Sequence, residues 1–177
     1  SKIKKHYKNK DFLYLKRPKI LSGDRVGKVK VIRHALLHAE KKFKIKFNFI
    51  FDLDITSPLR NIDDIKNCFK LIKDNKSNNL ITICEAKKNP YFNLVEIEKG
   101  KIFISKKLNR KVLSRQRAPK VYEMNASIYG WKREYLIKTD NLFSEKTSYY
   151  FMPHERSIDI DDIVDLKIVE MFLKNEK

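Results

Sequence analysis

The stretch YFMPHERSIDID at residues 150–161, followed by DIVDLKIVEMFL at residues 162–173, decides the predicted fold. Its first half places two carboxylates, Asp159 and Asp161, two residues apart between apolar neighbours. In an extended segment alternate side chains share one face, so both carboxylates would point to the same side. Mg²⁺ is usually held by one or two carboxylates together with substrate phosphate oxygens and water. The pair therefore indicates a metal site where an extended segment runs into a helix.

The second half of this stretch predicts that helix. Its apolar side chains are too numerous for a free surface helix, so we expect the helix to pack against a sheet. A second interpretation stays open, in which Asp161 or Asp162 caps the helix and Asp159 is an ordinary solvated residue. The apolar residues of the helix are Ile163, Val164, Leu166, Ile168, Val169, Met171, Phe172 and Leu173.

Composition predicts one globular domain over residues 1–177. The 177 residues, 42% of them hydrophobic, suffice for one buried core. We expect a cytoplasmic protein, because no apolar run is long enough for a membrane span and the charged start lacks the pattern of a signal peptide. Cys68 and Cys84 are expected to be buried free thiols, since their spacing is not that of a metal site.

The formal net charge of +18 favours anionic partners such as nucleotides, acidic sugars or nucleic acid. The lysines, however, are spread along the chain. No zinc finger, aromatic RNA-binding signature or Gly-x-x-Gly loop accompanies them. Membrane and nucleic-acid partners are therefore not expected, although a basic nucleic-acid-binding module is kept as an alternative.

Strands and helices alternate in the first half of the pattern. We predict a short strand over 11–16, a helix over 26–43 capped by Asp24, and a strand over 46–55. Asn61 and Asp64 then resemble a capping box. The helix that they open is expected to bury Ile62, Ile65, Cys68, Phe69 and Ile72.

The second half continues this alternation, with one interruption. We predict a strand over 79–86, a strand over 125–131 and a short helix over 132–138. The interruption is a hairpin over 94–105 that turns at Lys99-Gly100, within an excursion over 94–111 that is a candidate dimerisation arm. Alternating strands and helices predict a mostly parallel α/β sheet, with ligands outside the carboxyl ends of its strands.

Four short motifs then occur in one order: TSPLR at 56–60, RQ at 115–116 with Pro119, NASIY at 125–129 and SIDID at 157–161. Over about residues 10–173 the chain resembles the CMP-N-acylneuraminate synthetases, and most of all their CMP-legionaminate branch. The resemblance implies a three-layer, Rossmann-like nucleotidyltransferase fold and a homodimer. It also implies a reaction in which the anomeric hydroxyl of a nine-carbon 2-keto sugar acid attacks the α-phosphate of CTP and releases pyrophosphate.

The resemblance also implies a set of site residues. Asp159 and Asp161 match the positions that hold Mg²⁺, and Arg115, as a catalytic residue, can grip a carboxylate bidentately. The cytidine side would be lined by Arg17, Asp24, Val26 and Lys28. The sugar-acid side would be lined by Asp54, Thr56, Ser57, Tyr91, Asn93, Arg115, Gln116, Asn125 and Tyr129.

Departures from the family pattern refine the expected substrate and activity. Sialate-activating members usually carry Gln at the position of Asp54, and some carry Arg at the position of Glu123, so a legionaminate-like substrate is favoured. The family opens with a strand and a basic, glycine-containing triphosphate loop, which residues 1–177 do not contain. We therefore expect a domain that is incomplete at its N-terminus and has little activity alone. The alternative is a dimer-forming scaffold that uses the arm at 94–111. His154 is expected to be structural rather than a base.

Overall fold

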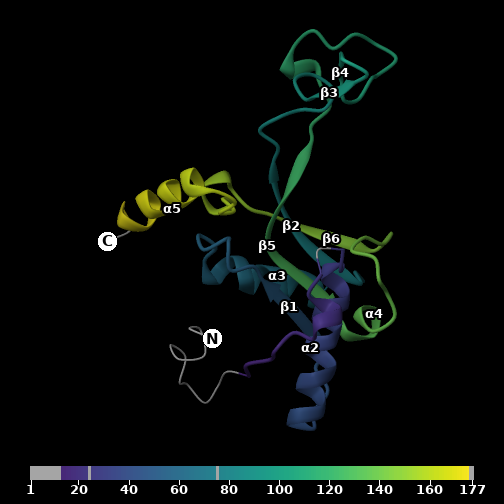
Figure 1. The fold of residues 1–177 in the computed structure, drawn as a ribbon, viewed down its shortest axis with the longest axis vertical. Helices are drawn as coiled ribbons and strands as arrows, with labels where there is room; N and C mark the ends of the chain where they lie inside the picture. The colour runs from purple at the N-terminus through teal and green to yellow at the C-terminus, as the bar shows by residue number, and fades with distance from the viewer. Residues whose placement is uncertain (1–12, 24, 75, 176–177) are drawn as a thin grey trace. The chain divides into compact units, whose positions relative to one another are not determined.

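The computed structural model describes residues 13–23, 25–74 and 76–175 (Figure 1). The helix predicted over 26–43 is present in slightly shorter form, and Asp24, its predicted cap, lies outside the described residues. None of the described helices is both long and apolar enough to cross a membrane. The helices are η1 Lys19–Leu21, α2 Lys28–Phe43, α3 Ile62–Asp74, η2 Arg115–Arg117, α4 Arg133–Leu136, η3 His154–Arg156 and α5 Ile163–Asn175. The strands are β1 Phe49–Leu53, β2 Asn79–Glu85, β3 Val95–Glu98, β4 Lys101–Ile104, β5 Tyr122–Lys132 and β6 Thr147–Phe151.

Four strands form a sheet in the order β1-β5-β2-β6. Strand β5 runs antiparallel to β1 and to β2, whereas β2 and β6 are parallel. The α/β class is confirmed, and the sheet is mixed rather than mostly parallel. The reason is that residues 86–121 contain a hairpin and a short 3₁₀ turn in place of the crossover helix that a parallel connection requires. The flanking bonds, from N–H to C=O, are Asp54 to Ser127, Arg133 to Asn48, Lys132 to Asn78, Ala86 to Val121, Asn78 to Lys146 and Met152 to Ile83.

The chain divides into two compact units. The first comprises the described residues of Ser1–Asp52 with Phe69–Leu80 and Tyr129–Ser148, and the second comprises Leu53–Cys68, Ile81–Ile128 and the described residues of Tyr149–Lys177. Each unit has its own buried apolar side chains, and Trp131, expected to be a core residue, is buried in the first unit. In the first unit these include Val29, Leu36, Ile72, Leu80, Trp131 and Leu136. In the second they include Leu59, Cys68, Ile81, Cys84, Ile128 and Met152.

The first unit begins less regularly than the sequence predicts. Residues 13–16 form no strand, which corrects the strand expected over 11–16. An extended segment becomes a strand only where a neighbour pairs with its backbone. Helix α2 is preceded by Gly27 as the N-cap residue, with no side-chain cap. It is tied to α4 by Glu40, which accepts two hydrogen bonds from the guanidinium of Arg133 at 2.6 and 2.9 Å.

The predicted capping box of α3 is confirmed. Asn61 Oδ1 accepts the N–H of Asp64 at 2.9 Å, and Asp64 Oδ2 accepts the N–H of Asn61 at 2.9 Å. The predicted buried stripe is only partly correct, because the side chains of Ile62 and Phe69 are exposed. Phe69 instead meets the ring of Phe49 edge-on, with centroids 5.4 Å apart. Helical spacing determines which side chains share a face. How much of that face is buried depends on the elements that pack against the helix.

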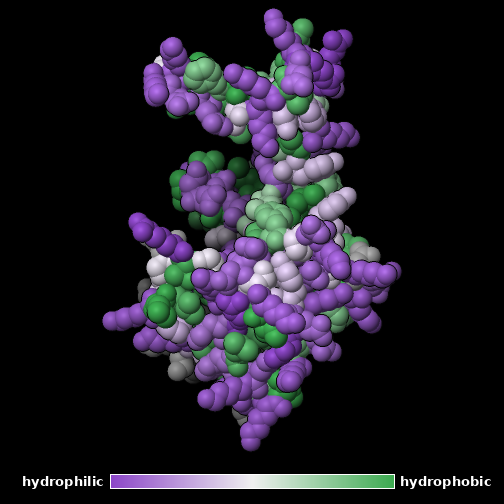
Figure 2. All heavy atoms as spheres, turned by 90° about the vertical axis from the view of Figure 1, so that its right-hand side faces the viewer, coloured by the Kyte–Doolittle hydropathy of each residue, from purple (hydrophilic) through white to green (hydrophobic). Residues whose placement is uncertain are grey.

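Two elements of the second unit expose many apolar side chains. Every residue of β3 and β4 is exposed. The hairpin turns at Lys99 and Gly100, whose φ angles of 50° and 76° are typical of a type I′ turn, as the sequence predicts. Helix α5 was expected to pack against the sheet, and this is wrong for most of its length. Val169 is buried, but Ile163 and Met171 are exposed. Figure 2 shows hydrophobic groups of this kind (green) at the surface among hydrophilic side chains (purple).

Candidate functional site

Two cavities in the second unit share Lys87 and His154. The larger has a volume of about 490 Å³, and the smaller has a volume of about 280 Å³. They differ in charge. Lys87, Arg115 and Lys120 line the larger cavity with a single carboxylate, that of Glu85. The smaller cavity is lined by four carboxylates, those of Glu123, Asp159, Asp161 and Asp165.

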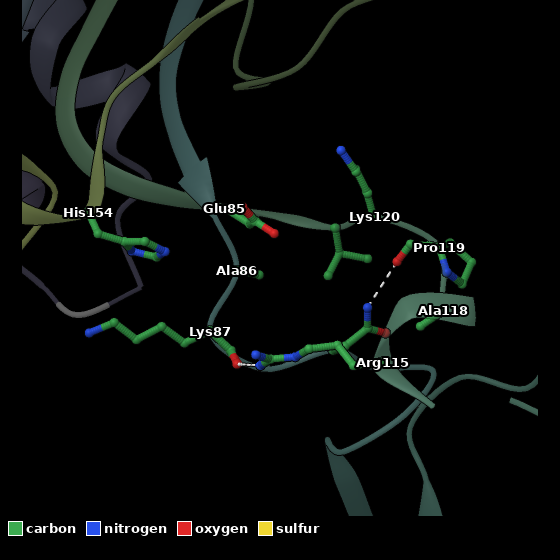
Figure 3. A pocket seen from close by; sticks show the side chains of 10 residues that line it. Glu85, Ala86, Lys87, Arg115, Ala118, Pro119, Lys120 and His154 are labelled. Atoms are coloured by element: carbon green, nitrogen blue, oxygen red, sulfur yellow. Dashed lines mark hydrogen bonds between the residues drawn. The ribbon is translucent and has the colours of Figure 1, made fainter. Parts of the chain in front are cut away.

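The larger, basic cavity lies between the loop that follows β2 and the turn η2. Arg115 Nη2 donates a hydrogen bond to the carbonyl of Lys87 at 2.5 Å, and Asn89 Nδ2 donates to the carbonyl of Pro119 at 2.9 Å. These two bonds join the loops, and Figure 3 shows the basic side chains around the space between them. A cavity lined by several cations attracts an anionic group, and a guanidinium matches the geometry of a carboxylate.

The smaller, acidic cavity contains both predicted metal ligands, Asp159 and Asp161. Carboxylate oxygens are the donors that Mg²⁺ and other hard cations prefer. Asp159 is half-buried and Asp161 is exposed. The predicted strand geometry is absent, because residues 157–161 have no regular secondary structure. The two carboxylates nevertheless line the same cavity.

A partly buried network of hydrogen bonds joins three of the four sequence motifs. The hydroxyl of Ser57 is fully buried and donates to the carbonyl of Asn125 at 3.3 Å and to Asp159 Oδ1 at 3.4 Å. Asn125 Nδ2 donates to Ser157 Oγ at 2.9 Å, and Asn125 Oδ1 accepts from Thr82 Oγ1 at 2.6 Å. The motifs at 56–60, 125–129 and 157–161 therefore meet at the acidic cavity, and their hydrogen bonds hold the segment that carries Asp159.

Asp162 is the aspartate that caps helix α5. Its Oδ1 accepts the N–H groups of Val164 and Asp165 at 2.7 and 3.0 Å, so Asp162 caps α5. Asp165 Oδ2 in turn accepts the N–H of Asp161 at 3.1 Å. A cap is present, as the second interpretation requires, but it uses neither the Asp159 nor the Asp161 carboxylate. The capping role and the cavity lining are thus divided between neighbouring residues.

Other predicted sugar-side residues mainly shape the loops. Asp54 Oδ1 accepts the hydroxyl of Thr56 at 3.0 Å, and Asn93 Oδ1 accepts the N–H of Asn89 at 2.7 Å. Tyr91 lines a different cavity and lies beside the ammonium group of Lys106, which is 5.8 Å from its ring centroid. Gln116 is exposed in η2 and, unlike Arg115, is not part of the basic cavity wall.

The first unit contains the predicted cytidine-side residues and Tyr129. Lys28 Nζ lies 2.9 Å from Asp52 Oδ2 and 4.3 Å from the ring centroid of Tyr129. Tyr129 is buried and its ring is stacked on Trp131. Arg17 is exposed and Val26 is half-buried, whereas Asp24 lies outside the described residues. The structure thus makes neighbours of Lys28 and Tyr129, which the sequence placed on different sides of the site.

Two relatives match most of the chain. It is 41% identical over 164 residues to post-translational flagellin modification protein B of Campylobacter coli, covering 93% of this chain and 69% of the relative. It is 44% identical over 161 residues to CMP-N,N'-diacetyllegionaminic acid synthase of Campylobacter jejuni, covering 91% of this chain and 68% of the relative. The chain belongs to the CMP-legionaminic acid synthase family. The resemblance drawn from four short motifs is confirmed. No protein-family model matches the chain.

Sequence reasoning missed several residues of the site in this member of the CMP-legionaminic acid synthase family. Lys87, Asn89 and Lys120 line or brace the basic cavity, and His154 lines both cavities. Lys87 carried a usable signal, because it follows the carboxyl end of β2, where ligands of α/β sheets are expected. Lys120 carried none that distinguishes it from the many other lysines. His154 was interpreted as structural because no neighbour in sequence orients it, but the fold supplies neighbours from β2 and β5.

Proposed function

We propose that the protein activates a legionaminate-like nine-carbon sugar acid with CTP, forming the CMP-sugar and pyrophosphate. The observation that carries this proposal is the 44% identity over 161 residues to CMP-N,N'-diacetyllegionaminic acid synthase. The nucleic-acid-binding module and the scaffold are not favoured by these relatives. In the proposed reaction a bond forms between the anomeric oxygen and the α-phosphorus, while the bond from that phosphorus to the oxygen it shares with the β-phosphorus breaks. Pyrophosphate leaves, and the proton of the anomeric hydroxyl is released to solvent.

The basic cavity is the proposed binding site for the sugar acid. Its volume of about 490 Å³ falls within the range of small-molecule sites. Arg115 retains guanidinium N–H groups beyond the one that it donates to Lys87, and these would grip the sugar carboxylate. Lys87 and Lys120 add positive charge to the same cavity wall. Holding the carboxylate here would orient the sugar for attack, which is the main task of an enzyme in phosphoryl transfer.

The acidic cavity is the proposed Mg²⁺ site. The oxygen donors gathered there fit a hard divalent cation, and Asp159 and Asp161 are the residues that would hold it. Bound Mg²⁺ would neutralise negative charge on the phosphate oxygens of the nucleotide. The contribution of the chain itself is positional, because Ser57 and Asn125 hold the segment of Asp159 through partly buried hydrogen bonds.

The remaining parts of the proposal extend to the whole protein. We propose a three-layer nucleotidyltransferase fold, with Arg17, Asp24, Val26 and Lys28 on the cytidine side, acting in the cytoplasm. We also propose a homodimer formed through the arm at 94–111. Support for the arm comes from its exposed apolar side chains, since contiguous apolar surface is typical of interaction sites. These side chains include Val95, Ile97, Ile102, Phe103 and Ile104.

Pyrophosphate release tests the reaction. The full protein that carries this chain is incubated with CTP, Mg²⁺ and each of a panel of nine-carbon sugar acids, with and without a chelator. We expect turnover with a legionaminate-type acid, loss of turnover on chelation and recovery when Mg²⁺ is restored. Absence of pyrophosphate release with every sugar acid of the panel would refute the proposal.

A matched pair of variants tests the metal ligands. Asp161→Asn removes a carboxylate of the acidic cavity, and we expect kcat/KM to fall about 100-fold or more, as when one positioned charge-stabilising group is lost. Asp162→Asn is the control, because asparagine caps a helix about as well as aspartate does. If the two variants have the same activity, the acidic cavity is not the metal site.

A further inference from the structure

Three side chains from separate elements converge beside the two cavities. Cys84 lies on β2, Glu123 lies on β5, and His154 opens η3. Their ligand atoms all lie within 4.8 Å of one another, and Cys84 Sγ is 3.5 Å from Glu123 Oε1. The sequence spacing of the two cysteines gave no sign of a metal site, because the other donors come from distant parts of the chain. The cluster is distinct from the carboxylate pair of the proposed Mg²⁺ site.

The donor set suits a softer cation than Mg²⁺. Thiolate sulfur, imidazole nitrogen and carboxylate oxygen are the three ligand types of Zn²⁺, whereas Mg²⁺ prefers oxygen throughout. In a tetrahedral site with bonds of about 2.0–2.3 Å, neighbouring donor atoms lie about 3.3–3.8 Å apart. The separation of Cys84 and Glu123, 3.5 Å, already falls in this range, and the remaining separations are all within 4.8 Å. We propose that Cys84, Glu123 and His154 form a Zn²⁺ site.

The backbone holds these three donors in place. Strands β2 and β5 are neighbours in the sheet, so Cys84 and Glu123 stand on a rigid support. The segment before His154 is attached to β2 by the bond from the N–H of Met152 to the carbonyl of Ile83, at 2.8 Å. Three protein ligands leave a fourth tetrahedral position. Because Glu123 and His154 line the acidic cavity, that position is accessible to water or to an anionic oxygen of a bound molecule.

A cation that binds at Cys84 must displace the proton of its thiol. Cys84 is buried, and this burial raises the pKa of its thiol, with the nearby Glu123 carboxylate adding to the effect. A nucleophilic cysteine and a metal-ligating cysteine both act as the thiolate, so this shift does not distinguish the two roles. Binding of Zn²⁺ at the sulfur replaces the thiol proton, which is released to solvent.

Metal titration tests the site without reference to sugar activation. Protein freed of metal by a chelator is titrated with Zn²⁺ in competition with a metal indicator, and separately with Co²⁺. We expect one tight equivalent of Zn²⁺ and, with Co²⁺, the near-ultraviolet charge-transfer absorption that thiolate ligation produces. Cys84→Ser should abolish this absorption. His154→Gln should weaken Zn²⁺ binding about 10–100-fold or more, the range already seen when only the outer partners of metal ligands are removed.

Controls exclude other donors in the described part of the chain. Cys68→Ser removes the second buried cysteine and should leave the charge-transfer absorption unchanged. His34→Gln with His38→Gln removes a histidine pair on α2, whose rings lie 6.4 Å apart, and Asp161→Asn removes a carboxylate of the acidic cavity. Neither change should reduce Zn²⁺ affinity appreciably. Glu123 and His154 are exposed, so their variants report on the site even if Cys84→Ser does not fold.

Two outcomes would overturn the site. One is wild-type protein that lacks the thiolate–Co²⁺ absorption. The other is Zn²⁺ binding that survives in His154→Gln but is lost in the α2 histidine variant. Because the readout is metal binding, either failure leaves the proposed cytidylyltransferase activity standing. Conversely, an inactive protein that binds Zn²⁺ as described would refute only the proposed function.

Discussion

Replacing Asp64 by asparagine tests whether one buried carboxylate anchors the turn before the acidic site. The Asp64 side chain is 1% exposed. Its Oδ2 accepts hydrogen bonds from Arg156 Nε at 3.0 Å and from the Asn61 N–H at 2.9 Å. Its Oδ1 accepts from Arg156 Nη2 at 3.0 Å and from the Tyr150 hydroxyl at 3.3 Å. Arg156 ends the turn η3, directly before Ser157.

The cost follows from this geometry. Each carboxylate oxygen of Asp64 accepts hydrogen bonds from two donors, one of which is on the Arg156 guanidinium. In the Asp64→Asn variant an NH₂ group replaces one of these oxygens. Whichever oxygen is replaced, the NH₂ group faces two donors and can accept from neither. Removing one partner of a buried ion pair typically costs about 3–5 kcal/mol. The Arg156 side chain is 31% exposed and regains water, which lowers the expected destabilisation to about 2–3 kcal/mol.

Urea unfolding measures this loss. We expect the unfolding midpoint to fall while the m-value stays constant, because a local change does not alter the area exposed on unfolding. Asp63→Asn is the matched control. Asp63 is 77% exposed and pairs only at 3.6 Å with Lys66, so its loss should cost less than about 0.5 kcal/mol. Adding Arg156→Gln to Asp64→Asn should cost little more, because the two residues act as one unit. A destabilisation below about 1 kcal/mol for Asp64→Asn would refute the anchoring role.

Two further changes test the packing of the first unit. The hydrogen bond from Arg133 lowers the pKa of the Glu40 carboxyl in the folded protein. The ion pair therefore adds stability at neutral pH. This stability is lost as the pH falls from the pKa of the unfolded chain, about 4.3, through the lower pKa of the folded protein. Glu40→Gln should therefore flatten the acid limb of the stability–pH curve, and an unchanged limb would contradict this reasoning. At Gly130 an added Cβ would lie 2.9 Å from Phe51 Cε1, so Gly130→Ala should cost about 1–3 kcal/mol in urea unfolding. Gly23→Ala, where nothing lies within 4 Å, is the control, and equal midpoints for the two variants would contradict the close contact.

The sequence correctly predicted those elements that are determined by residues close together in the chain. The reciprocal bonds of Asn61 and Asp64 depend on two side chains three residues apart, and the Lys99-Gly100 turn depends on residues that tolerate positive φ. Strand β6 was not predicted, because its apolar and polar residues form no clear alternation and it exists by pairing with β2. The exposure of α5 was missed for a related reason. An apolar helix indicates that some surface will cover it but does not identify that surface.

The candidate site shows why net charge is a poor guide to local chemistry. The chain carries +18 overall, but four of its 22 acidic residues fall within 159–165, and Asp159, Asp161 and Asp165 line the acidic cavity. The cations of the basic cavity come from the end of β2 and from the loop 115–120. This loop precedes β5, and the antiparallel pairing of β5 with β2 brings it close to the end of β2. Lys87 and His154 line both cavities, so a region of positive potential and a region of negative potential adjoin at these two side chains. Such a junction favours a ligand that presents an anionic group on one side and a bound cation on the other. A sugar acid beside a metal-bound phosphate has this pairing of charges, whereas a uniformly anionic polymer would be repelled by the carboxylates of the acidic cavity.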